Sequence, residues 1–250
     1  MCSLQPLDGS SIWEPSFGTH PSCASPAFDA SHDTSKMCAG DPTSLDVDFS
    51  RLPGDSTSCP HYQTVCSFDV SRVESINFDV EMRQCGDIWA CPLWMSPSQW
   101  RSPQHSSGEI DFVENCKGNL NISFGEDAPY IGRWPGRDAA DLQRQHVQLD
   151  FLQDGSVLPT MTDAKTGQSV SGLHLTGALS YRSSTSFNWK DNPFRLISDI
   201  WNGTSGDGGY ANCQGHSVPN SKCAYTVSNI KIASNDGREM FSGKCAAMNA

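Results

Sequence analysis

The chain has 250 residues, 37% hydrophobic residues and a formal net charge of −11 at pH 7. This length and hydrophobic content are enough for one large domain with a buried core. The negative charge disfavours nucleic acid or an anionic membrane surface as a partner, and no run of about 18 apolar residues predicts a membrane span. A neutral polymer such as a glucan is compatible with this charge, although negative charge also serves solubility alone.

The sequence contains 11 cysteines, a high number for its length. It has no CxxC pair and no Cys/His cluster with zinc spacing, so disulfides in an oxidising compartment explain the number better than a metal site. The close pairs that could staple loops are Cys59/Cys66, Cys85/Cys91 and Cys213/Cys223. Spacing does not determine the connectivity. The odd count leaves at least one thiol outside intramolecular pairs, and we expect it to be Cys2, near a terminus.

These cysteines favour an extracellular or secretory-pathway location. Residues 1–18 do not have the basic start and apolar core of a signal peptide. Two sequons, Asn121-Ile122-Ser123 and Asn202-Gly203-Thr204, fit secretion but are common by chance.

Residues 1–44 are rich in Ser, Pro, Asp and Gly, and we interpret them as a loop-rich segment that can include outer strands of the same domain. The pattern changes at Leu45, where apolar residues alternate with polar ones as in a half-buried strand. Further segments with strand-like patterns are residues 65–70, 76–82, 110–113, 145–151, 194–201 and 225–232. The best helical candidate, residues 138–145, is short.

Asp154-Gly155 follows the clearly alternating segment 145–151 and predicts a hairpin turn there. No long stripe with helical period and no internal repeat occurs. The sequence therefore predicts one all-β domain of two packed antiparallel sheets, with residues 45–235 as its main part and residues 236–250 as a C-terminal tail.

Three carboxylates lie within six residues in the segment Glu109-Ile110-Asp111-Phe112-Val113-Glu114. On a regular strand, Glu109 and Asp111 point to one face, whereas Glu114 points to the other. A β-bulge near Phe112 or Val113 would add one residue and return Glu114 to the carboxylate face. We therefore predict a bulge at this position.

Such a face suits a retaining glycosidase, whose two carboxyl groups lie about 5–5.5 Å apart. One carboxylate attacks the anomeric carbon, and the other protonates the leaving oxygen and then activates water. Crowding of the acids would raise at least one pKa, which keeps one acid protonated near neutral pH. A solvated acidic edge strand would show the same pattern, so the motif alone does not decide the function.

The residues around this motif make it more specific. Residues 86–95, GDIWACPLWM, precede the acidic segment. Together the two segments resemble glycoside hydrolase family 16, the laminarinases, lichenases and related β-glucan transferases. Residues 146–155, 192–197 and 224–232 resemble further segments of that family in the same order. Trp89 and Trp94 are five residues apart rather than the family's usual four, with Cys91-Pro92 between them.

The resemblance implies a jelly-roll β-sandwich with a concave substrate groove. It also implies Glu109 as the nucleophile, Asp111 as its supporting carboxylate and Glu114 as the acid/base. Trp94 is similar to the tryptophan that lines the family's cleft. The tryptophans expected to bind substrate are Trp94, Trp89 and Trp100.

We expect a monomer that binds a polysaccharide, uses no cofactor and contains no catalytic metal. The family frequently holds a structural calcium, but Ala224 stands where the family has an Asp at the start of the last strand.

Two other interpretations stay open. The first is a non-catalytic β-glucan-binding module on the same fold, although such relatives usually lose a catalytic glutamate. The second is a disulfide-rich cell-wall protein, which would leave the acidic motif unexplained. A serine hydrolase is disfavoured because the Ser-rich stretches lack a G-x-S-x-G elbow. The sequence does not decide the polymer, its linkage, or hydrolysis against transfer.

Overall fold

The structure is a computed structural model, and the residues that it describes are 2–6, 12–15, 43–48, 61–85, 89–97, 110–116, 119–123, 132–138, 142–154, 156–170, 193–201, 223–234, 241–243 and 245–249. Strands dominate these ranges, and the helical element among them is the short 3-10 helix η3 (Val70–Arg72). Within them, no helix is long and apolar enough to cross a membrane.

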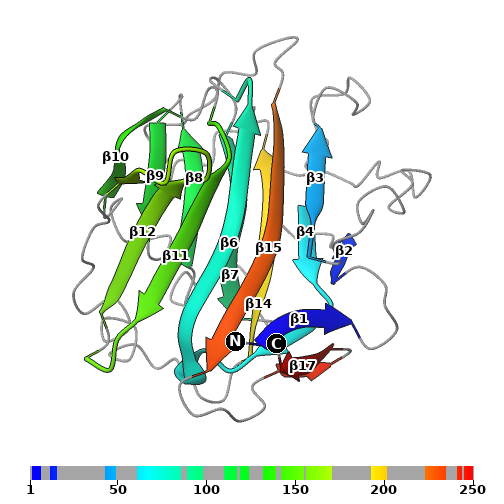
Figure 1. Cartoon of the computed structure of the whole chain (residues 1–250). Coiled ribbons are helices and arrows are strands. Elements are labelled where there is room, and N and C mark those ends of the chain that lie inside the picture. Colours follow the sequence, from blue (N-terminus) through cyan, green and yellow to red (C-terminus); the bar gives the residue numbers. More distant parts are fainter. Residues whose placement is uncertain are drawn as a thin grey trace, which may run out of the picture.

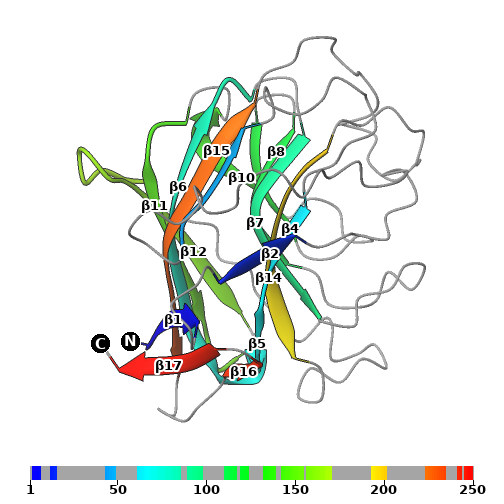
Figure 2. The same cartoon turned by 90° about the vertical axis from the view of Figure 1, so that its right-hand side faces the viewer.

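The described strands form two antiparallel sheets that pack face to face (Figures 1 and 2). The eight-stranded sheet runs β13 (Ser169–Val170), β12 (Val157–Asp163), β11 (Gln145–Phe151), β6 (Val73–Arg83), β15 (Ala224–Ser234), β1 (Cys2–Pro6) and β17 (Cys245–Asn249), and β3 (Leu45–Asp48) also pairs with β15. The nine-stranded sheet runs β10 (Gly132–Asp138), β9 (Asn119–Ser123), β8 (Ile110–Cys116), β7 (Trp89–Pro97), β14 (Phe194–Trp201), β4 (His61–Thr64) and β2 (Trp13–Pro15). Its other two strands are β5 (Cys66–Phe68), which pairs with β14, and β16 (Phe241–Gly243), which pairs with β5. The predicted all-β jelly-roll sandwich is confirmed.

Strand β11 shows how the sequence pattern produces a half-buried strand. Its odd positions, including Val147 and Leu149, are buried, and its even positions are partly exposed. It pairs in unbroken register with β12 on one side and with β6 on the other. Asp154 stabilises the turn to β12, because its carboxylate accepts hydrogen bonds from the backbone N–H and the hydroxyl of Ser156. The hairpin predicted at this position is confirmed.

The core lies between the two sheets. Phe78 of β6 and Phe112 of β8 meet across it with ring centroids 6.1 Å apart. The hydroxyls of Tyr225 on β15 and Ser198 on β14 lie 2.8 Å apart in a buried hydrogen bond, so each hydroxyl has a polar partner inside apolar surroundings. Burial and the hydrogen-bonded hydroxyl together fix β14 against the opposite sheet.

Several strands differ from the sequence-based expectation. The segment predicted as one strand at 65–70 is divided between β5 and η3. Asp138 ends β10, and residues 142–144 lead directly into β11 without helical structure, so the helical candidate at 138–145 is wrong in its described part. The expectation did not include β7, whose continuous apolar run and internal Pro92 do not show the alternation of a half-buried strand.

Strands from both ends of the chain join the sheets. β1 pairs with β15 and β17, near the two marked termini in Figures 1 and 2. β2 pairs with β4, and Ile12 and Trp13 are buried in the core. The indole N–H of Trp13 donates to the carbonyl oxygen of Thr43 at 3.0 Å. These contacts tie segments outside residues 45–235 to the sandwich.

A disulfide joins Cys85, just after β6, to Cys223, just before β15. These two strands are neighbours, so the bond closes a loop of 138 residues between adjacent strand ends. The expected pairs Cys85/Cys91 and Cys213/Cys223 are therefore wrong, because strand pairing and not sequence proximity brings the sulfurs together. Cys66 is also in a disulfide, and the expected partner Cys59 lies outside the described residues. Cys91 is a buried reduced thiol; the side chain of Cys2, the expected thiol, is outside the described part.

Candidate active site

Strand β8 carries two of the three predicted catalytic carboxylates. Ile110, Phe112 and Val113 belong to the core between the sheets. Asp111 and Glu114 are buried polar residues that do not belong to it, with exposures of 6% and 2%. Asp111 lies opposite Trp94 of β7, which also packs outside the main core. Both carboxyl groups therefore lie on the outer face of the nine-stranded sheet.

A β-bulge in β8 explains why two residues three positions apart share this face. Toward β9, Asp111 pairs with Ser123 and Glu114 with Asn121, so three steps on β8 match two on β9. Toward β7, the pairing changes between Val113 and Asp111 with the same one-residue excess on β8. The extra residue leaves two successive apolar side chains in the core and turns the next residue outward. The bulge predicted near Phe112 or Val113 is confirmed.

Two side chains bond to the carbonyl groups at this bulge. The indole N–H of Trp134, on β10, donates to the carbonyl oxygen of Phe112 at 3.3 Å. The thiol of Cys91, on β7, donates to the carbonyl oxygen of Val113 at 3.4 Å. A bulge disrupts the regular ladder, and buried carbonyl groups need partners. Trp134 and Cys91 therefore help to hold the backbone that aims Glu114.

Strand β7 contains a second bulge, which accounts for the unusual spacing of Trp89 and Trp94. Three steps from Cys91 to Trp94 match two steps on β14, and the pairing with β8 shifts in the same stretch. Ala90 and Leu93 are core residues, whereas Cys91 and Trp94 pack on the outer face, so the extra residue is Pro92. Proline cannot donate to a strand ladder and is tolerated at a bulge. The inserted residue is thus absorbed locally, and Trp94 keeps its place beside Asp111.

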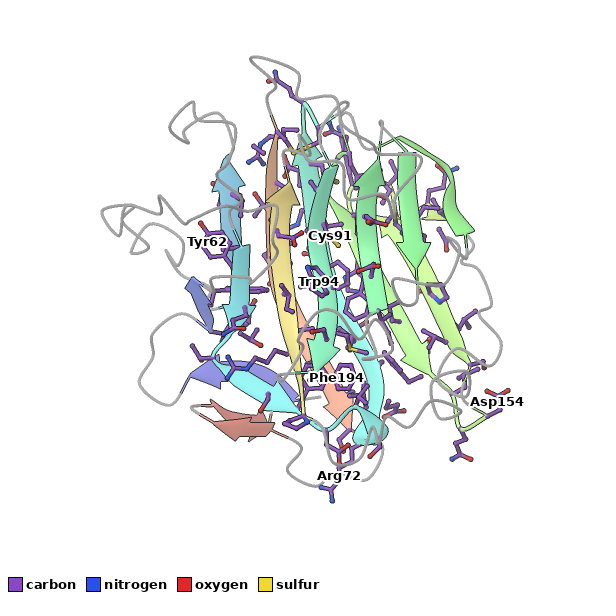
Figure 3. All side chains as sticks on the ribbon, turned by 180° about the vertical axis from the view of Figure 1, so that it is seen from behind. Tyr62, Arg72, Cys91, Trp94, Asp154 and Phe194 are labelled. Carbon is purple, nitrogen blue, oxygen red and sulfur yellow. A yellow bond between two sulfur atoms is a disulfide. The ribbon has the colours of Figure 1, made fainter. Side chains whose placement is uncertain are left out.

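Cys91, Trp94 and Ile197 form a small apolar cluster on this outer face, separate from the main core. Figure 3 shows Cys91 and Trp94 on neighbouring positions of β7, seen from the side of the nine-stranded sheet. The sulfur of Cys91 lies 4.0 Å from the carboxylate oxygen Oδ1 of Asp111. Trp94 is 6% exposed. Its ring is therefore largely occupied by protein contacts and offers little surface for stacking.

A fourth acid, Asp199 on β14, belongs to the same face, and sequence reasoning missed it. It pairs with Cys91 of β7. Burial, followed by the nearby Asp111 carboxylate, raises the pKa of Asp199 to about 8, against a smaller lowering by the nearby Trp94 indole. A carboxyl group with this pKa is mostly protonated at neutral pH. The signal that could have found it is its position in the pattern Arg195, Ile197, Asp199, where alternate residues share one face.

The remaining predicted site residues are not tested by the structure. Glu109 and Trp100 lie outside the described residues. The same holds for the segments 98–109, 124–131, 171–192 and 202–222, which precede or follow strands of the nine-stranded sheet along the chain. Trp89 begins β7, but its side chain is not described. The predicted nucleophile, the three-tryptophan set and the groove stay predictions.

The outer face of the eight-stranded sheet holds a different polar cluster. Asp79 of β6 accepts hydrogen bonds from Arg144 (Nε, 3.1 Å) and Asn229 (2.7 Å), and His146 Nδ1 lies 3.0 Å from its other oxygen. Burial alone would raise the pKa of Asp79, but the hydrogen bonds from Asn229, His146 and Arg144 and the charge of Arg144 outweigh it and lower this pKa. The cluster ties β6 to β11 and β15, which is a structural role for His146.

Among the described residues, no group of three or more His, Cys, Asp or Glu side chains is arranged to hold a metal ion. Ala224, which opens β15, has no oxygen in its side chain to offer a calcium ion.

The fold is shared with solved glycosidase structures. No protein-family model and no curated protein matches the sequence. The catalytic domain of an endo-1,3-beta-glucanase (laminarinase) from Thermotoga petrophila RKU-1 matches 98% of this chain and 100% of its own, with a TM-score of 0.51 and 13% identity. A laminarinase from Flavobacterium sp. UMI-01 matches 76% of this chain and 79% of its own, with a TM-score of 0.50 and 15% identity.

A third match comes from work on endo-acting O-glycanases that members of the human gut microbiota express to initiate mucin breakdown. It covers 76% of this chain and 79% of its own, with a TM-score of 0.51 and 12% identity. What these structures and this chain have in common is the fold. A shared fold does not determine the chemistry of a chain, which depends on its own site residues.

Proposed function

We propose that the chain is a retaining, endo-acting glycoside hydrolase or transglycosylase of glycoside hydrolase family 16 that acts on β-glucan-type polysaccharides. The observation that carries this proposal is the bulge in β8, which places Asp111 and Glu114 together on the outer face of the nine-stranded sheet. The fold shared with two laminarinases supports it. A solvated acidic edge strand is disfavoured, because β8 lies between β7 and β9 and its acids are buried.

In the proposed mechanism, Glu109 is the nucleophile. Regular alternation from Asp111 puts residue 109 on the same face, two positions earlier. The Glu109 carboxylate attacks the anomeric carbon, and the bond to the leaving sugar oxygen breaks as that oxygen takes the proton of Glu114. Glu114, now ionised, removes a proton from water or from an acceptor hydroxyl. The activated oxygen attacks the anomeric carbon and displaces Glu109, which restores both carboxyl groups and gives net retention.

Asp111 lies between the two glutamates in sequence and supports them in this proposal. Its carboxylate can accept a hydrogen bond from a protonated glutamate beside it, which favours the protonated form that the acid/base needs. Trp94 packs on Ile197 and Cys91 and so forms a rigid apolar surface beside Asp111. Sugar stacking is then assigned mainly to other aromatic residues of the proposed groove, including Trp100 and Trp89.

The proposed setting is extracellular, in agreement with the Cys85–Cys223 disulfide. We propose a monomer that needs no cofactor, because the two carboxyl groups supply the nucleophile and the proton. Polysaccharide recognition without nucleic acid or membrane partners fits the net charge of −11.

The direct test measures reducing-sugar and oligosaccharide release from laminarin, lichenan and agarose. The variants are Glu109→Gln and Glu114→Gln. Glu81→Gln is the matched control, since Glu81 lies on β6 of the other sheet in a half-exposed ion pair with Arg83. Adding short oligosaccharide acceptors separates transfer from hydrolysis.

We expect the wild type and Glu81→Gln to release products whose first-formed anomer is β, and the two site variants to lose nearly all activity. Release of α-anomers first would contradict the retaining mechanism. If no polymer is cleaved by any form while glucan binding persists, the chain is a binding module and the enzyme proposal fails.

A further inference from the structure

Asp199 occupies a central position on the outer face of the nine-stranded sheet. Its strand, β14, lies between β7 and β4, and Asp199 pairs with Cys91 on one side and with His61 on the other. Cys91 in turn contacts Asp111 of β8. Because the strand order is β8, β7, β14, Cys91 on β7 lies between Asp199 on β14 and Asp111 on β8.

The groups that act on Asp199 from neighbouring elements carry no positive charge within the described residues. From β7 they are the Trp94 indole and the Cys91 thiol, and from β8 the Asp111 carboxylate. From β15 the buried phenol of Tyr225 approaches through the core. Tyr62 of β4 is a neighbour of that phenol, and burial raises its own pKa to about 12, so it stays neutral. On β14 itself, Arg195 donates to the carbonyl oxygen of Thr64.

A largely desolvated carboxyl group beside another carboxylate cannot ionise easily. Removing a carboxylate from water costs free energy, and a second negative charge nearby adds to that cost. Burial is the larger of the two effects on Asp199, followed by the charge of Asp111. Two such groups bind one proton between them over a wide pH range. The raised pKa of Asp199 keeps the proton on this residue at neutral pH.

We propose that Asp199, in its neutral form, is a positioning residue for the acids of β8, and that its ionisation sets the alkaline limit of activity. The proposal rests on the proposed function, which it extends to a residue outside the acidic motif. While Asp199 holds its proton, it adds no negative charge beside Asp111. When Asp199 loses the proton, repulsion between the two aspartates across Cys91 disturbs the Asp111 carboxylate and the face that it shares with Glu114.

The substitution Asp199→Asn tests this idea, because an amide has the same shape as the neutral acid and cannot ionise. We expect the alkaline limb of the kcat/KM profile to move upward by about one pH unit or more. The ratio of activity at about pH 9 to activity at about pH 6 should rise on the order of tenfold relative to the wild type. The matched control is Asp150→Asn on β11 of the other sheet, which should leave the limb in place.

His61→Gln is included because His61 is the titratable residue that pairs with Asp199 on β4. The limb should stay in place in this variant. If it moves with His61 and not with Asp199, the proposal is overturned. It is also overturned if Asp199→Asn leaves the limb unchanged, or if folded Asp199→Asn is inactive at every pH, because the neutral amide would then not replace the acid.

A measurement independent of activity separates this proposal from the proposed function. Carbon-13 NMR of the Asp carboxyl carbons, with Asp199→Asn to assign the signal, should show Asp199 protonated at neutral pH and titrating near the pKa of about 8. An Asp199 signal that is already ionised at about pH 6 overturns the proposal. If the wild type cleaves no polymer, the proposed function fails, while the NMR titration still decides whether Asp199 holds the proton.

Discussion

The outer faces of the two sheets each contain a largely buried aspartate on a central strand, and the two aspartates behave in opposite ways. Asp79 on β6 receives hydrogen bonds from Asn229, His146 and Arg144, which lower its pKa. Asp199 on β14 has Asp111 and Trp94 as its neighbours, and its pKa is raised to about 8. The residue type and the strand setting are the same, so the neighbours on adjacent strands decide the charge.

This difference separates a stabilising face from a face suited to chemistry. A carboxylate with cationic and amide partners contributes to folding and has little reason to change its protonation. Acids placed close together without cations lower the stability of the folded chain, and such unfavourable clusters are typical of functional sites. The eight-stranded sheet therefore presents a structural network, and the nine-stranded sheet presents the candidate site.

The largest expected effect is a difference in kcat/KM between a Glu114 variant and an Asp79 variant. Glu114→Gln removes the proposed proton donor and should lower kcat/KM by about 10²–10⁴-fold. Asp79→Asn lies on the other sheet and should change kcat/KM less than about twofold at a temperature where the variant is folded. Steady-state kinetics on the best polymer, with circular dichroism to verify folding, checks both. Equal losses in the two variants would remove the functional distinction between the faces.

The next effect concerns stability and the Asp79 network. Asp79→Asn loses charge-assisted hydrogen bonds to Arg144 and should destabilise the fold by about 1–3 kcal/mol near pH 7. Because the folded pKa of Asp79 is lowered, its contribution is present above the unfolded value of about 3.9 and is lost as pH falls through the folded value. Urea unfolding at about pH 7 and about pH 3 should therefore show a larger difference at the higher pH.

The pH dependence of the contribution to stability has the opposite sign for Asp199. Its folded pKa is raised, so the wild type loses stability as pH rises from about 4 to about 8, where the folded state must give up its proton. Asp199→Asn removes this penalty and should raise Tm by a few degrees at about pH 8.5, but not at about pH 4. Differential scanning calorimetry at the two pH values measures it. A lower Tm for the variant at both would show that the acid stabilises the fold in its ionised form.

The smallest expected effect sharpens the account of the bulge. Trp134→Phe keeps a buried aromatic ring but removes the indole N–H that donates to the Phe112 carbonyl oxygen. Loss of that hydrogen bond should destabilise the chain by about 1 kcal/mol. A displacement of Glu114 should lower kcat severalfold with little change in KM. A loss of stability without a change in kcat would show that Trp134 does not position the acid.

Much of the fold was predictable because local patterns agree with the final structure. The alternation at residues 145–151 gave β11 its bounds, and the turn at Asp154 gave the hairpin to β12. The bulge in β8 was predictable for a different reason. Glu114 can join Asp111 on one face only if one residue is added between them, so the function expected of the motif predicted an irregularity in the backbone.

Other features depend on which strands become neighbours, and the sequence does not show this directly. Cys85 and Cys223 are far apart in the chain and meet because β6 pairs with β15. Asp199 meets the acidic face because β14 pairs with β7. Strand β7 itself was missed, since it is buried along its length and its Pro92 is accommodated only by a bulge. Non-local pairing thus decided the features that sequence patterns did not predict.

In the proposed mechanism the bulge makes Glu114 the acid/base, and Glu109 is a separate nucleophile. Azide rescue with an activated β-glucoside tests this most directly. In Glu114→Ala, azide should restore turnover and yield a β-glycosyl azide, because the nucleophile still forms the covalent intermediate. In Glu109→Ala, azide should replace the nucleophile and yield an α-glycosyl azide. An α-product from Glu114→Ala, or no rescue of a folded Glu114→Ala that has lost activity, would contradict the account.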